Sequence, residues 1–148
     1  MNFSFFIYLF LLRFCHNAAS LEVPCELVKS RHWSWTIDDF ILTCFLDDVT
    51  TIGTDDTSIS SPKDNTVKGL LLEDNQNIKF LPVKVYEKFP SLVGLSAFDC
   101  RIKTISKTNF EKLYNLKEIH LHGNQIERIS SNTFEDLSSL EQVFLGKF

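Results

Sequence analysis

Hydrophobic residues recur along residues 116–140 with a spacing that fits neither a helix nor a strand over the whole segment. The apolar positions, with one asparagine among them, are Leu116, Ile119, Leu121, Asn124, Ile126, Ile129, Phe134, Leu137 and Leu140. A helix would repeat about every 3.6 residues and a strand about every two. The pattern predicts a strand over 117–122, a sharp turn at Asn124 and an arc that carries the chain around.

The same spacing occurs in the neighbouring segments. In the segment 24 residues earlier, the matching positions are Leu92, Leu95, Ala97, Cys100, Ile102, Ile105, Phe110 and Leu113. In the segment 25 residues before that one, the matching positions are Val67, Leu70, Leu72, Asn75, Ile78, Leu81, Tyr86 and Phe89. A partial copy follows at Leu140, Val143 and Leu145. One such coil cannot bury its apolar edge alone, so these copies predict stacked coils.

This spacing matches the leucine-rich repeat, L-x-x-L-x-L-x-x-N-x-L. The predicted fold is therefore an α/β solenoid: a short leucine-rich repeat horseshoe segment with a curved parallel β-sheet, over residues 67–148, in three full coils and one truncated coil. Asn124 should bond backbone groups that turn out of the sheet. Cys100 takes the asparagine position of its coil, which predicts a buried free thiol; an intermolecular disulfide is the alternative.

The outer arcs of the coils carry their own pattern. Residues 107–113 and 131–137 each predict a helical turn, capped by Thr108 and Ser131. Phe110 and Phe134 lie 24 residues apart and should stack between coils. Two prolines, at 82 and 90, remove backbone donors and predict an irregular first arc.

Residues 21–52 predict an N-terminal β cap, because apolar and polar residues alternate there as in strands with one buried face. We pair Cys25 with Cys44, so that a disulfide staples this cap over the open end of the solenoid. Trp33 and Trp35 should shield that end; a ligand-binding pair is the alternative. Residues 53–66, rich in Thr, Ser, Asp and Pro, predict a surface loop.

Residues 1–20 have the anatomy of a signal peptide: a short apolar core followed by Ala18, Ala19 and Ser20. We expect cleavage after Ala19 or Ser20 and a secreted, extracellular protein. No later stretch is apolar enough to span a membrane. The formal net charge of −4 argues against nucleic acid as the partner.

Residues that alternate with the buried strand positions should line the concave face of the sheet. The predicted binding residues there are Leu71, Glu73, Ser96, Phe98, Glu118, His120, His122 and Phe144. Leu71, Phe98 and Phe144 are apolar where solvent is expected, and exposed apolar groups among polar ones are typical of a contact surface.

Glu118, His120 and His122 fall on one face of one strand, and His-x-His is a spacing that metals can use. A zinc-dependent hydrolase at His120 and His122 is therefore a distant alternative, and a pH-sensitive contact patch is another. The sequence contains no G-x-S-x-G elbow and no glycine-rich phosphate loop. We predict no enzyme activity, no metal and no cofactor.

The chain resembles animal extracellular leucine-rich repeat proteins, most closely the secreted or receptor-type forms of insects. The resemblance is carried by the export signal, by Cys25 with Cys44 before the repeats, and by coils of 24 residues with Phe110 and Phe134. It implies a protein-binding recognition role, as in innate immunity or adhesion. The alternative is the N-terminal piece of a longer receptor or matrix protein, and the open C-terminal edge predicts self-association.

Overall fold

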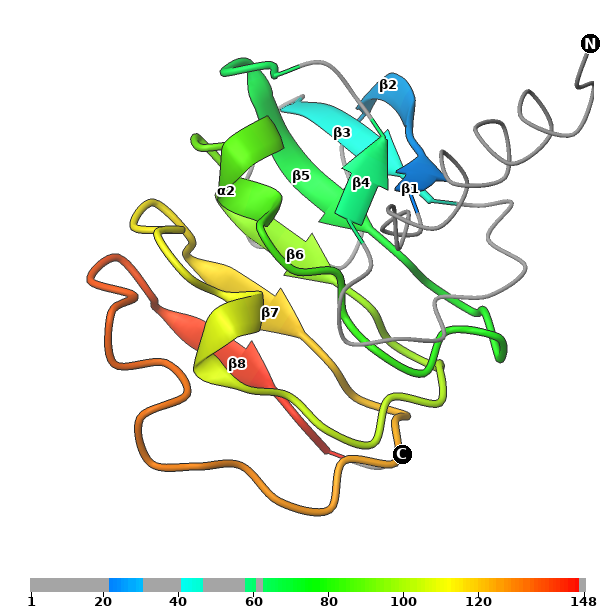
Figure 1. Cartoon of the computed structure of the whole chain (residues 1–148), viewed down its shortest axis with the longest axis vertical. Coiled ribbons are helices and arrows are strands. Elements are labelled where there is room, and N and C mark those ends of the chain that lie inside the picture. Colours follow the sequence, from blue (N-terminus) through cyan, green and yellow to red (C-terminus); the bar gives the residue numbers. More distant parts are fainter. Residues whose placement is uncertain (1–21, 31–40, 47–57, 61–62, 147–148) are drawn as a thin grey trace, which may run out of the picture.

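Six strands form one sheet, and five of them run parallel as the rungs of a solenoid (Figure 1). The computed structural model describes residues 22–30, 41–46, 58–60 and 63–146. In sheet order the strands are β2 (Glu26–Ser30), β3 (Ile41–Phe45), β5 (Val67–Leu71), β6 (Gly94–Ser96), β7 (Glu118–His120) and β8 (Gln142–Phe144). Only β2 and β3 pair antiparallel. The predicted parallel-sheet solenoid is confirmed.

The inward-pointing residues of successive coils lie side by side. Leu70 pairs with Leu95, Leu95 with Ile119, and Ile119 with Val143. Two residues further along each coil, the next inward positions are Leu72, Ala97 and Leu121, and each is no more than 1% exposed. Their backbone N–H groups continue the ladder by donating to Ser96, His120 and Phe144 at 2.8 Å. Apolar burial and backbone pairing therefore repeat together, once per coil.

Asn124 fastens the turn after β7 to the preceding coil. Its Nδ2 donates to the carbonyls of Ala97 (2.6 Å) and Leu121 (3.0 Å), and its Oδ1 accepts from the N–H of Ile102 (3.0 Å). These backbone groups turn out of the sheet, and leaving such a buried group unpaired costs about 1–3 kcal/mol. The side chain therefore does what the repeat pattern predicts.

The residue before each asparagine position has left-handed backbone: Asp74, Asp99 and Gly123 have φ of 54°, 51° and 69°. Aspartate tolerates this conformation better than most residues. At Gly123 a Cβ would also lie 1.8 Å from Oδ1 of Asp99. Glycine is therefore required there by close approach as well as by backbone angle.

Cys100 is a buried free thiol, as predicted. Its Sγ donates to the carbonyl of Leu72 at 2.8 Å, the bond that corresponds to Asn124 with Ala97. Burial raises the pKa of this thiol from 9.0 to about 11, and the carboxylates of Asp74, Asp99 and Glu73 add to the rise. The sulfur is therefore a poorly reactive packing group.

The predicted Cys25–Cys44 disulfide is present and joins the chain just before β2 to β3. Cys44 and Leu46 belong to the main apolar core, so β3 continues the solenoid wall into the cap. The predicted loop over 53–66 is partly wrong. Within it β4 (Ser58–Ser60) pairs with β1 (Glu22–Pro24), because Ile59 is buried in the core and orders its neighbours. Trp33, Trp35 and the predicted signal peptide lie outside the described residues.

The arcs differ from prediction in their details. The first arc, predicted to be irregular, holds a short helix, α2 (Val85–Lys88), between its two prolines. The second holds a 3₁₀ turn, η1 (Lys107–Asn109), capped by Ser106 and not by Thr108. The third is a run of turns. Each arc is long enough for about one turn of helix. Local side-chain hydrogen bonds therefore determine which residue caps that turn.

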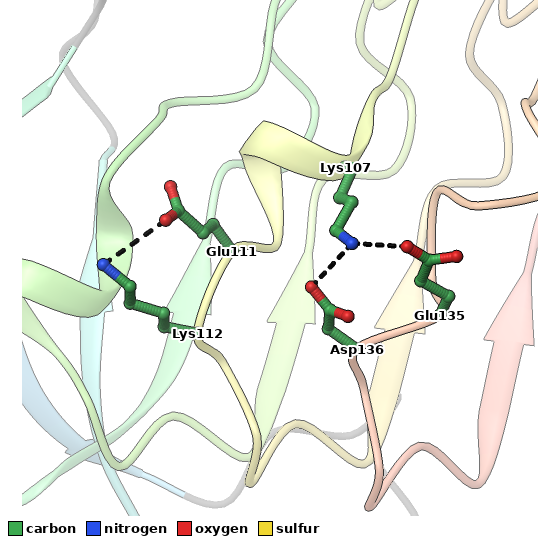
Figure 2. A network of polar contacts seen from close by, with 5 residues as sticks. All are labelled: Lys107, Glu111, Lys112, Glu135 and Asp136. Atoms are coloured by element: carbon green, nitrogen blue, oxygen red, sulfur yellow. Dashed lines mark hydrogen bonds and ion pairs between the residues drawn. The ribbon is translucent and has the colours of Figure 1, made fainter.

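Neighbouring arcs are tied by an aromatic contact and by ion pairs. The rings of Phe110 and Phe134 lie 5.2 Å apart between centroids, as predicted. Lys107 of the second arc pairs with Glu135 and Asp136 of the third (Figure 2). All three side chains are exposed, so solvent screens the ion pairs and they contribute little to stability. The buried ring contact is the stronger tie.

Candidate functional site

Seven of the eight predicted binding residues form two rows across the sheet, on the face opposite the arcs, and the eighth, Glu118, lies in the adjacent row beside Gly94 and Gln142. Strand pairing places Leu71 beside Ser96, Ser96 beside His120, and His120 beside Phe144. A second row, one step beyond the strands, holds Glu73, Phe98 and His122. We call this surface the concave face. Strand alternation along the sequence predicts this surface, and its role in binding stays a prediction.

The predicted exposure of this face is wrong for most of it. Leu71 is 1% exposed and Phe98 is 7% exposed, and Ser96, Glu118 and His120 are buried as well. Leu71 packs with Ile41, Phe45 and Val93 in a small apolar cluster of its own. Glu73 and His122 are half-buried. Phe144 is the exception, with 40% of its surface exposed.

Stacked rings account for part of this burial. The rings of Phe98 and His122 are 4.9 Å apart and inclined by 7°, and those of His120 and Phe144 are 4.4 Å apart and inclined by 29°. Neighbouring strands are about 4.8 Å apart, so flat side chains at matching positions cover one another. The two stacks meet edge-on at His120 and His122 (6.2 Å).

Glu118 and His120, which lie two residues apart on β7, contact each other. Nε2 of His120 lies 3.4 Å from Oε2 of Glu118, and both side chains are buried. Within the described part of the chain, no group of three His, Cys, Asp or Glu side chains has the geometry to hold a metal ion. Glu118, His120 and His122 form a cluster in which the Glu118 carboxylate contacts the His120 ring and the two histidine rings meet edge-on.

Comparison with known proteins identifies the repeat. A family model described as Leucine rich repeat matches residues 98–147, which cover the second half of the solenoid. No curated protein matches the chain significantly. Across the described ranges, no helix has the length and apolar character needed to cross a membrane. Residues 98–147 are therefore similar to leucine-rich repeats, which typically serve protein interaction, and the strand ladder continues the same parallel-sheet solenoid from β3 to β8.

Proposed function

We propose that this chain is a secreted recognition protein that binds a protein ligand through the C-terminal part of its concave face. One observation carries the proposal: the aromatic–histidine stack on β7 and β8 ends in the exposed ring of Phe144. Leu71 and Phe98 do not contact the ligand, because they are buried: Leu71 packs with Ile41 in a separate apolar cluster, and Phe98 is stacked on His122.

Phe144 has the properties of an interface anchor. Aromatic side chains are enriched among the residues that dominate binding energy, and they are surrounded by polar contacts that exclude water. Half-buried Gln142 and His122 flank the ring on the same face. The stack on His120 holds the ring in place before binding, which lowers the entropic cost of association.

Tyr114 provides a matched control for the binding test, because it is an exposed aromatic residue (55%) outside the concave face. The oxidised protein and its Phe144→Ala and Tyr114→Ala variants are used as bait against secreted proteins of the source organism. We expect Phe144→Ala to weaken recovery of the ligand about thirtyfold and Tyr114→Ala to leave it unchanged. Equal recovery by both variants would overturn the concave-face proposal.

The proposed biological setting is extracellular, in innate immunity or adhesion through protein–protein contact. It is supported by the signal-like segment at residues 1–20 and by the Cys25–Cys44 disulfide, a type of bond that persists in oxidising compartments. Expression of the full chain in animal cells tests it. We expect protein in the medium with its new N-terminus close to residue 20, whereas retention inside the cell with Met1 intact contradicts export.

A further inference from the structure

A hollow of about 460 Å³ lies beside the sheet, on the flank where the chain has just left the strands. Its walls come from three successive coils: Gln76, Lys79, Phe80, Arg101, Lys103 and Gln125. Three of these, Gln76, Arg101 and Gln125, each directly follow the asparagine position of their coil. The volume falls within the range of about 300–1,000 Å³ that is usual for ligand sites. We call this hollow the lateral groove.

The lateral groove is lined by three cations that have no partner of opposite charge within the described part of the chain. Lys79, Arg101 and Lys103 are exposed, and among the described residues they form no ion pair. Elsewhere in the described structure, Lys112 pairs with Glu111 and Lys117 with Glu141, whereas Lys84 and Lys88 form no ion pair. The groove is therefore a locally positive surface on a chain whose formal net charge is −4.

Arg101 is held in position before any ligand arrives. Gln76 donates through Nε2 to the carbonyl of Asp99 at 2.7 Å, and Nε of Arg101 donates to Oε1 of Gln76 at 3.0 Å. Because Gln76 is bonded at Nε, the two terminal nitrogens of the Arg101 guanidinium remain available as a planar pair of donors for an acceptor. Such a fork matches the two oxygens of a carboxylate.

We propose that the lateral groove binds a short acidic segment of a protein partner. Carboxylates of the segment pair with Arg101 and Lys103, and its apolar atoms rest on half-buried Phe80. The amide of Gln125 suits a peptide backbone, which both donates and accepts hydrogen bonds, and the amide of Gln76 keeps one N–H and one lone pair beyond its bonds to Asp99 and Arg101. A long polyanion fits less well, because beyond the groove it would meet a surface of net negative charge. The groove is separate from the concave face, so neither proposal depends on the other.

The test uses a fluorescent hexaglutamate peptide titrated with the full-length oxidised protein at low ionic strength. We expect saturable binding, no binding of hexaglutamine, and weakening as salt is added. Arg101→Gln/Lys103→Gln should lower affinity by about tenfold or more, because hydrogen bonds to charged groups are lost. Lys84→Gln/Lys88→Gln removes the same charge from the first arc, outside the groove, and should change affinity less than about twofold.

Three results would overturn the proposal. Hexaglutamate fails to bind; both double variants weaken binding equally, which indicates general attraction only; or a heparin hexasaccharide binds more tightly than hexaglutamate, which indicates a sulfated glycan instead. Unfolding midpoints show whether each variant is folded. If Arg101→Gln/Lys103→Gln is unfolded, the single Lys103→Gln variant decides, because this exposed side chain makes no bond within the described structure.

Discussion

The turn after each strand can be built by two different side chains. Asn124 donates to three carbonyls and accepts from one N–H, whereas the thiol of Cys100 reaches the carbonyl of Leu72 and, at 3.5 Å, that of Phe98. An asparagine at position 100 would accept a hydrogen bond from the N–H of Ile78. In this chain that N–H donates instead to the carbonyl of Asn75, at 3.1 Å. Cysteine is tolerated because the backbone itself satisfies the remaining donor.

Cys100 should make the protein sensitive to alkaline pH. The folded state holds the pKa of this thiol at about 11, above its ordinary 9.0, so the unfolded chain releases the proton first. Its contribution to stability is complete below pH 9.0 and is lost as pH rises through about 11. Urea unfolding across this range should show wild type losing stability faster than Cys100→Ala. Parallel curves for the two proteins would show that the thiol does not titrate in this way.

The second and third arcs show how one residue changes an element. In the second, Asn109 accepts from the N–H of Ser106 at 2.9 Å and donates to the carbonyl of Leu81 at 3.1 Å, which forms a capping box and a tie to the previous coil. The third arc has Ser130 in the matching position but Thr133 in place of the asparagine. The buried hydroxyl of Thr133 has no hydrogen-bond partner in the described structure.

Thr133→Asn should therefore stabilise the third arc. The backbone is already suitable, because the N–H of Thr133 donates to the carbonyl of Ser130 at 3.0 Å, as that of Asn109 does to Ser106 at 3.1 Å. A completed capping box is worth about 1 kcal/mol, or a rise of roughly 2–4 °C in the unfolding midpoint of a chain of this length. Thermal unfolding followed by circular dichroism measures it, with the exposed neighbour Ser131→Asn as control. A lower midpoint would mean that the site is too tightly packed for the larger side chain.

At the scale of the whole molecule, the sequence predicts the coils better than the surfaces. Inward positions must be apolar in every coil. Their spacing therefore shows where the strands lie and which residues of neighbouring strands pair. Exposure follows different physics: Phe98 is covered because His122 stacks on it from the next coil, and alternation along one strand carries no such information. The lateral groove was missed for a related reason, because its walls are distant in sequence and meet only after the coils stack.

The disulfide should stabilise the cap and the coils as one unit. Cys25 and Cys44 are 19 residues apart, and closing a loop of that size in the unfolded chain is worth about 3 kcal/mol. Cys25→Ala/Cys44→Ala should therefore unfold at lower urea. Reductant should destabilise wild type by a similar amount and leave the double variant unchanged, because Cys100 is a free thiol in both. Since Cys44 and Leu46 share a core with Leu70 and Leu72, the loss should appear in a single transition. Two transitions, with the second unchanged, would show that the coils stand without their cap.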